Sequence, residues 1–323
     1  MRDFSSGDPV NWLTLRAGRV NGVSSLVTLR ILIARNLRTF LRDHMTVFFS
    51  LTAPLILFVL FVVFFRENNA KLIADAIGGG AKSDAYAVCD AWLFGSIGTL
   101  ATFSSSLGLL TSFVDDRVTG RFADYLVSPV RRWQLALGYV MSSVIVSVVL
   151  SSLLVLLGQV WARTQGQAFM STMQDLRMLM AIVVACVFFA SFNTLIVTYT
   201  ATTGAFGGYS IIMGTAMGFL SFCYTPPSTL SSNINSFLSA WPFAQTAALI
   251  RAPVMEPAIS RLTDQISDAG LRDTASQTIA DNLGMHLTVS GHSLSPALMV
   301  GMILALTVVL ALLSAWRMGR VIR

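Results

Sequence analysis

A chain of 323 residues is long enough for about two soluble domains, but its composition excludes that organisation. Hydrophobic residues make up 54% of the chain, charged residues only 12%, and the mean hydropathy is +0.68. A soluble domain carries roughly 25% charged residues, and a disordered chain needs low hydrophobicity. The composition therefore predicts a protein that lies mostly in a lipid bilayer.

The net charge of +6 and the pI near 9.6 would suggest nucleic acid as a partner of a soluble protein. In a membrane protein, the excess of arginine instead indicates which loops face the cytoplasm, so no nucleic-acid partner is expected. The three cysteines lie far apart and form neither a disulfide pattern nor a zinc pattern: Cys89, Cys186 and Cys223.

The first 44 residues carry seven arginines and no long apolar core, so no cleavable signal peptide is expected. We expect residues 1–23 to form a cytoplasmic tail and residues 24–44 to form an amphipathic helix in the membrane interface. A soluble packing helix is the alternative. At 100° per residue, Arg35, Arg38 and Arg42 share one arc, and a second arc is apolar: Leu26, Leu29, Ile33, Leu37 and Phe40.

Residues 45–323 are predicted to form an all-α, six-span transmembrane domain, since ~20 apolar residues cross the hydrocarbon core. The charge-free runs place the spans at Thr46–Phe65, Ala91–Val114, within Trp133–Ala162, at about 178–200, at about 207–224 and at about 295–316.

The segment 228–250 is ambiguous, because it is uncharged but rich in Ser and Asn. It could be a seventh span or re-entrant helices in the outer leaflet. With six spans and both termini in the cytoplasm, the inner segments hold 14 Lys and Arg and the outer segments hold 8. A seventh span would reverse this bias, so we predict six spans and an external region at 226–294, with re-entrant helices and then a helical stretch at 258–287.

Motifs for catalysis are absent from the sequence. No HExxH or Gly-x-Ser-x-Gly pattern occurs, and His286 and His292 are interpreted as surface residues of a polar loop rather than metal ligands. A phosphate-binding loop needs Gly-Lys-Ser/Thr, but Lys71 and Lys82 both follow alanine. The span cores lack ionisable residues, and Asp90 is interpreted as an interfacial end residue. We therefore expect no metal, no cofactor and no catalytic site on this chain.

The segment 115–132 is the most informative stretch, because acidic and basic residues alternate there beside an apolar edge formed by Phe122, Tyr125 and Leu126. Pro129 is expected to end this short helix. A stiff element of this kind suits docking into a groove of a soluble partner. A membrane loop also needs charges to stay hydrated, so both interpretations remain open.

At this segment the sequence resembles the membrane subunits of ATP-binding-cassette exporters of the type-2 class, most closely the drug-resistance and antibiotic-export branch. The likeness rests on the order of several features: a basic helix at 24–43, Ala53-Pro54, Asp115-Asp116-Arg117, Gly120, Leu126 to Pro129, Arg131-Arg132 and Trp241-Pro242-Phe243. Two features depart from the pattern, namely the long external region 226–294 and the acidic residue Asp124.

The resemblance implies a dimer of six-span halves in the bacterial plasma membrane, each docked on a cytosolic ATPase that binds ATP and Mg. The halves would pair two copies of this chain or two paralogues. The substrate would be an amphipathic drug, antibiotic or lipid-like molecule. The alternatives are a polysaccharide or glycolipid export permease, a secondary carrier without an ATPase, and a membrane scaffold.

The resemblance also implies two sets of site residues. The ATPase-coupling set is Asp115, Asp116, Arg117, Gly120, Arg121, Phe122, Asp124, Tyr125 and Pro129. The set expected to line the translocation path, on the second and fifth spans, is Thr102, Phe103, Ser104, Ser105, Ser106, Tyr209, Met213, Met217 and Phe219.

Overall fold

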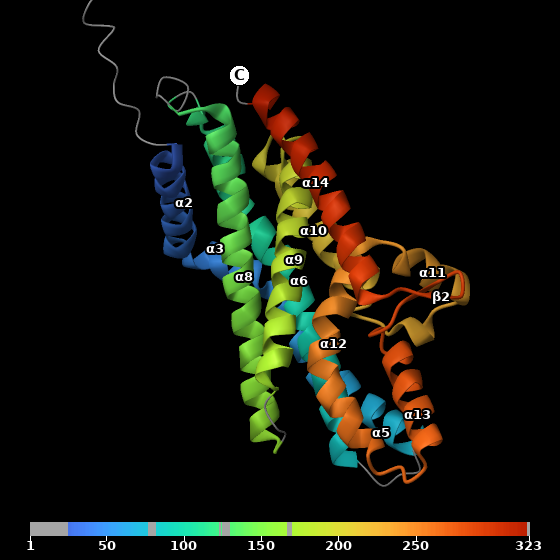
Figure 1. Ribbon diagram of the computed structural model, residues 1–323. Helices are drawn as coiled ribbons and strands as arrows, with labels where there is room; N and C mark the ends of the chain where they lie inside the picture. Colours follow the sequence, from blue (N-terminus) through green and yellow to red (C-terminus); the bar gives the residue numbers. More distant parts are fainter. Residues whose placement is uncertain (1–24, 77–81, 123, 125–129, 167–169, 322–323) are drawn as a thin grey trace, which may run out of the picture.

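The computed structural model describes residues 25–76, 82–122, 124, 130–166 and 170–321, and these residues are almost entirely helical (Figure 1). The elements are α2 (Ser25–Arg42), α3 (His44–Ser50), α4 (Thr52–Leu60), the π-helix η1 (Phe61–Phe65), α5 (Arg66–Ala76), α6 (Lys82–Val118), α8 (Arg132–Thr164), α9 (Thr172–Val197), α10 (Thr203–Leu220), the 3₁₀ turn η2 (Pro227–Thr229), α11 (Ser232–Ser239), α12 (Pro242–Thr263), α13 (Ala269–Asn282), β1 (Thr288–Val289), β2 (His292–Ser293) and α14 (Pro296–Val321).

Four helices of the described part are long and apolar enough to cross a membrane, namely α6, α8, α9 and α14. The pair α3 and α4, bent by 47°, is a fifth candidate if it forms one span. The predicted fifth span, 207–224, lies mostly in α10, which ends at Leu220, has 18 residues and is about 27 Å long. The all-α membrane class is confirmed. The number of six spans stays a prediction, because α10 is not among these candidates.

Helix α6 lies at the centre of the bundle. It packs most extensively against α8 and α12, and nearly every residue from Ala85 to Leu110 is buried. Small residues let the helices approach closely, as expected for helix packing in membranes. A Cβ atom added at Gly158 of α8 would lie 2.4 Å from Cγ of Phe94 on α6. Alanine is thus excluded at this crossing unless Phe94 moves.

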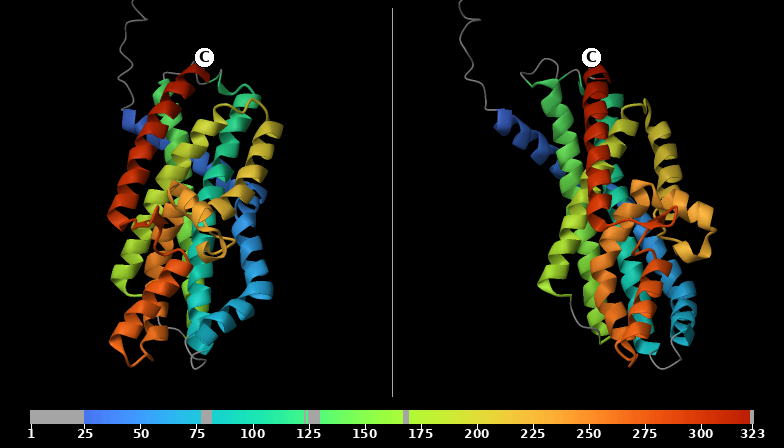
Figure 2. Two further views of the ribbon diagram at one scale, coloured as in Figure 1. Left: turned by 90° about the vertical axis from the view of Figure 1, so that its right-hand side faces the viewer. Right: turned by 45° about the vertical axis from the view of Figure 1, so that its right-hand side comes forward.

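Figures 1 and 2 show two ends of the molecule. The C-terminus and the turn after α6 lie at one end, and α5 and α13 lie at the opposite end. Helix α2 lies at the edge of the bundle beside α8, and it buries Leu32, Asn36 and Phe40. Leu26, on the predicted apolar arc of α2, is 72% exposed, so its placement in the membrane interface stays a prediction.

The predicted external region has a different organisation from the one expected. Helix α12 runs without a break from Pro242 to Thr263, past residue 250 where the ambiguous segment was expected to end, and it includes Pro253 and Pro257. The expected helical stretch 258–287 is in fact the end of α12 followed by α13. A hairpin pairs Thr288 with Ser293 and was not predicted. Helix α12 packs on α6 and α9, so its apolar contacts outweigh the backbone hydrogen bonds that proline removes.

Candidate functional site

The C-terminal end of α6 carries a cluster of charges around Asp116, a predicted coupling residue. Its side chain is 2% exposed and accepts hydrogen bonds from three groups. Arg35 of α2 donates to Oδ1 at 2.9 Å and lies 2.7 Å from Oδ2, while Arg121 donates to Oδ1 at 3.1 Å. The hydroxyl of Tyr139 on α8 donates to Oδ2 at 2.5 Å. One carboxylate therefore joins α2, α6 and α8.

Two positive charges stabilise the buried negative charge of Asp116. Burial alone would lower the pKa of Arg35, but the hydrogen bonds to Asp116 and Tyr139 outweigh burial and raise that pKa above its ordinary value. Because an arginine side chain is always charged in proteins, the buried carboxylate has two cationic partners. Arg35 and Arg121 are 31% and 56% exposed, so they remain in contact with water while Asp116 does not. The cluster is a buried anion held by two half-exposed cations.

Arg117, the neighbour of Asp116, reaches a different part of the bundle. Its Nη1 donates to the carbonyl oxygens of Thr198 at 3.1 Å and Thr200 at 2.7 Å. These residues follow the C-terminal end of α9, where carbonyl groups lack helical partners and attract cations. Adjacent residues of α6 thus bind α2 and α8 on one side and the α9–α10 connection on the other.

The residues after Asp116 form a tight turn. Gly120 has φ +75, a conformation that favours glycine, and a Cβ atom there would meet nothing within 4 Å. Phe122 folds back to contact Phe113 and Tyr139, with ring centroids 5.3 Å and 6.5 Å away. Of the other predicted coupling residues, Asp115 is half-buried, Asp124 is exposed, and Tyr125 and Pro129 lie outside the described residues.

A separate group of hydrogen bonds lies deeper in the bundle, around Ser106 of α6. Ser143 of α8 donates to Oγ of Ser106 at 2.9 Å, and Nδ2 of Asn193 on α9 donates to the same oxygen at 3.3 Å. The hydroxyl of Tyr209 on α10 donates to Oδ1 of Asn193 at 2.8 Å. Four helices are therefore connected by polar side chains that have few alternative partners in a bilayer.

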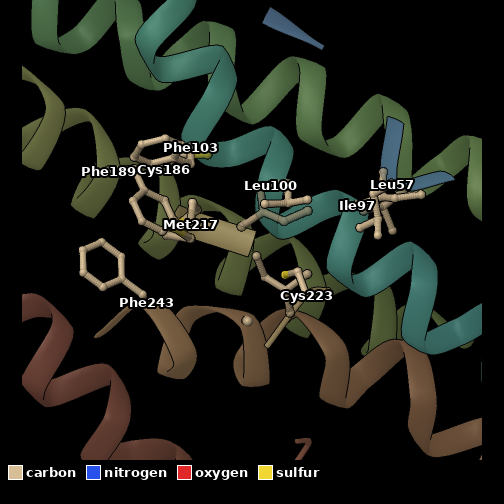
Figure 3. Close-up of a cluster of buried hydrophobic side chains, with 14 of the residues drawn as sticks. Leu57, Ile97, Leu100, Phe103, Cys186, Phe189, Met217, Cys223 and Phe243 are labelled. Carbon is tan, nitrogen blue, oxygen red and sulfur yellow. The ribbon is translucent and has the colours of Figure 1, made fainter. Parts of the chain in front are cut away.

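The residues predicted to line the path occupy two environments. Thr102, Phe103, Ser105, Ser106 and Met217 are buried inside the chain. Figure 3 shows Phe103 beside Phe189, with Met217 close by, in the hydrophobic core. Ser104, Tyr209 and Met213 are partly buried, and Phe219 is 53% exposed.

A groove runs between the α3–α4 pair, α6 and α10. Its volume is about 630 Å³, and its walls are mostly apolar. Of the predicted path residues, Phe103 and Ser104 line this groove, together with other residues that the sequence did not single out, among them Phe49, Ile56, Phe206 and Ile211. The groove therefore also includes residues of the α3–α4 pair and of the N-terminal half of α10.

Two buried charges were also misjudged. Asp90 was interpreted as an interfacial end residue, but it is 1% exposed. It accepts two hydrogen bonds from Arg66 of α5, from Nε at 2.7 Å and from Nη2 at 2.8 Å. The presence of one arginine before the first external loop was the only sequence signal for this pair. Such a bidentate bond ties α5 firmly to α6.

The second misjudged charge is Arg251 of α12, which was assigned to an outer loop but is fully buried. Its Nη2 donates to the carbonyl oxygens of Ser221 at 2.8 Å and Phe222 at 2.7 Å, and its Nε donates to Ser96 at 3.2 Å. Within the described residues, no carboxylate pairs with it. Arg251 thus caps the end of α10.

A family model described as ABC-2 type transporter matches residues 27–253, which is more than half of the chain. The chain belongs to the ABC-2 type transporter family. No curated protein sequence matches it. The match extends from α2 into α12 and includes the Asp116 cluster, the groove and Arg251, whereas α13, the hairpin and α14 follow it.

Membership in the ABC-2 type transporter family confirms the resemblance at the level of the class. The chain is a multi-pass membrane component of a transporter, and such a permease generally works with a partner ATPase subunit. The family match places Asp116 and its partners inside the membrane domain of an ABC-2 type transporter.

Proposed function

We propose that this chain is the membrane subunit of an ATP-powered exporter that moves an amphipathic drug, antibiotic or lipid-like molecule out of a bacterial cell. ATP and Mg would bind to a separate cytosolic ATPase, and this chain would contribute no catalytic site. Two membrane subunits would pair, as copies or paralogues. The termini and the turn after α6 would face the cytoplasm.

The bonding at the end of α6 supports this proposal most strongly. A movement imposed on the polar turn that begins at Thr119 acts on Asp116 and Arg117, which bind α2, α8 and the α9–α10 connection. Charge-assisted hydrogen bonds are short and directional, so they transmit a displacement rather than absorb it. The serine and asparagine bonds deeper in α6 extend the connection to α10. The groove between α6 and α10 would change shape in response.

The groove also supports the proposed type of substrate. Its size lies within the range of small-molecule sites, and its apolar walls carry a few hydroxyl groups, such as those of Ser104 and Ser210. Within the described residues that line it, none is charged. An amphipathic molecule with an apolar body fits such walls better than a highly hydroxylated polysaccharide, which needs many hydrogen-bonding partners.

The variant Gly120→Val tests the coupling role. Valine is strongly disfavoured at φ +75, so the turn must change conformation although space is available. We expect ATP-dependent export of a fluorescent amphipath from vesicles containing both subunits to fall about tenfold, as when about 1.4 kcal/mol of coupling is lost. The amount of inserted protein should not change.

Gly166→Val is the matched control. Gly166 has φ +79 and equally open surroundings, but it follows α8 at the opposite end of the molecule. This variant should export at the wild-type rate. If Gly120→Val exported the substrate as fast as Gly166→Val, the coupling role would be refuted. Export by this chain without any ATPase would favour a secondary carrier.

A further inference from the structure

A second cavity lies away from the groove, and its lining residues include residues of α5 and α13. Its volume is about 380 Å³, within the size range of small-molecule sites. It is enclosed by η1 and α5 on one side, by α6 behind, and by η2 and α13 on the other side. The cavity and the groove share no lining residue.

The inner wall of this cavity is aromatic and rigid. The rings of Phe61 and Trp92 are 5.6 Å apart between centroids, and both side chains are almost fully buried. The indole Nε1 of Trp92 donates to the carbonyl oxygen of Leu283 at 3.0 Å. Because this bond satisfies the only polar atom of the indole, Trp92 offers the cavity an apolar surface.

The remaining walls are apolar or polar without charge. Ile73, Ile279 and Leu283 extend the apolar surface, while polar groups come from Asn69, Thr278 and Asn282 and from the η2 turn. No charged residue of the described part lines the cavity. An anionic or cationic group bound here would lose water without gaining a counter-ion, so a charged ligand is disfavoured.

The local backbone also points to a function. Phe61 is the first residue of the π-helix η1. Single π-helical turns inside α-helices are rare, and they are frequent at functional sites. Phe61, the first residue of this turn, lines the cavity.

From these features we propose that the cavity between η1, α6 and α13 binds a neutral amphipathic molecule, whose alkyl or aryl body packs on Phe61 and Trp92 and whose hydroxyl or amide group meets Asn69 or Asn282. This site is separate from the groove of the proposed transport path. Its occupancy does not depend on ATP.

Cys89 provides a reporter for this site, because its side chain lines the cavity whereas Cys186 and Cys223 do not. We would measure by mass spectrometry how fast N-ethylmaleimide modifies each cysteine of the protein in nanodiscs, with and without 1-decanol. We expect decanol to slow the modification of Cys89 at least about fivefold, as for a mostly occupied site, and to leave the other two cysteines unchanged.

Ala275→Trp fills the cavity from α13, and Gln277→Trp adds the same bulk to an exposed position of that helix outside the cavity. Thermal unfolding confirms that both variants fold. Decanol should slow the modification of Cys89 only in wild type and Gln277→Trp. If the neutral ester and acyl chain of a bilayer lipid already occupy the site, decanol has little further effect on Cys89, and lipid co-purifies with wild type but not with Ala275→Trp.

Those two results support the cavity as a binding site and distinguish a free amphipath from the bilayer as the source of the ligand. Modification of Cys89 at equal rates with and without decanol, together with equal retained lipid in wild type and Ala275→Trp, would overturn the proposal. The proposed export function would stand in that case, because neither measurement involves transport.

Discussion

Two buried charges stabilise the bundle in opposite ways. Asp116 has two arginines and a tyrosine as partners, and those arginines extend to water. Arg251 has carbonyl oxygens and a serine as partners, pairs with no carboxylate of the described residues, and is fully buried. The first arrangement can rearrange by exchanging protein contacts for water, whereas the second cannot. Asp116 therefore suits a moving joint, and Arg251 suits a fixed one.

The largest effect is expected at the fixed joint. Arg251→Met keeps much of the volume but leaves the carbonyl groups of Ser221 and Phe222 without their donor. Buried groups that lose a partner cost about 1–3 kcal/mol each, so we expect a loss of about 2–4 kcal/mol in the free energy of unfolding. Denaturant unfolding in detergent, followed by fluorescence, measures this loss.

Arg177→Met is the control for that measurement, because Arg177 forms an exposed ion pair with Glu256. An exposed pair is worth about 0–1 kcal/mol. Arg251→Lys should recover less than half of the loss, since one ammonium group cannot reproduce the planar donors of arginine. If Arg251→Met were as stable as Arg177→Met, Arg251 would not fix the end of α10.

At the moving joint, stability and function should separate. Asp116→Asn keeps the shape and removes the charge, and Arg35 and Arg121 can turn to water. We expect a stability loss of about 1–2 kcal/mol, smaller than that of Arg251→Met, because hydrogen bonds to a charged group are worth about 1.5–3 kcal/mol and part of this is regained in water. ATP-dependent export should fall more steeply than stability.

Asp115→Asn is the matched control for the moving joint. Asp115 precedes Asp116 on α6 and is only half-buried, and no ion pair to it occurs within the described residues. This variant should keep both stability and export. Equal loss of export in the two variants would mean that the general negative charge of the turn matters, rather than the bonds of Asp116.

The contrast also shows how far a sequence can predict such a protein. The long spans followed from charge-free runs, because the bilayer leaves few alternatives for apolar residues. The coupling role of segment 115–132, inferred from charge alternation and the family resemblance, stays a prediction. Arg251 could not be found in this way. Arg251 directly follows a charge-free run of 73 residues, so the hydropathy pattern predicted that Arg251 begins a water-exposed loop. Its partners Ser96 and Ser221 are distant in sequence and uncharged, so no charge pattern indicated them.

The burial of the expected path residues could not be predicted for a related reason. Position on a span does not reveal which face of the helix is turned toward its own bundle, and Thr102, Ser105 and Ser106 face inward. The end of the uncharged segment at residue 250 likewise does not end a helix, because α12 continues through Pro253 and Pro257 and is stabilised by its contacts with α6 and α9. Tertiary packing decided both cases.

Glycine substitutions also distinguish the surroundings of Arg251 from those of Asp116. A Cβ atom at Gly95 would lie 2.8 Å from Cγ and 3.0 Å from Cα of Arg251, so Gly95→Ala must push α12 away. At Gly138, near the Asp116 cluster, the nearest atom is Cβ of Leu32 at 3.2 Å. We expect a loss of about 1–3 kcal/mol for Gly95→Ala.

Gly138→Ala should change stability by less than about 1 kcal/mol, because the gain in helix propensity offsets the tight contact. Denaturant unfolding of both variants measures the difference. A larger loss for Gly138→Ala would show that the α2–α8 contact is the rigid one, contrary to the assignment of the moving joint.

The smallest effect is expected at a carboxylate with almost no burial. Asp43, between α2 and α3, accepts hydrogen bonds from the hydroxyl and the backbone N–H of Thr46, and these bonds lower the pKa of Asp43 below its ordinary value. The cap is therefore fully present above the unfolded pKa, near pH 4. Its contribution is lost as the pH falls further, through the lower folded pKa. Hydrogen exchange of the Thr46 amide, corrected for intrinsic rate, should lose about twofold protection over this range.

In the variant Asp43→Asn the new amide side chain still caps the helix without titrating, so the protection of the Thr46 amide should stay constant with pH. A constant value in wild type as well would mean that water, rather than Asp43, satisfies the first turn of α3.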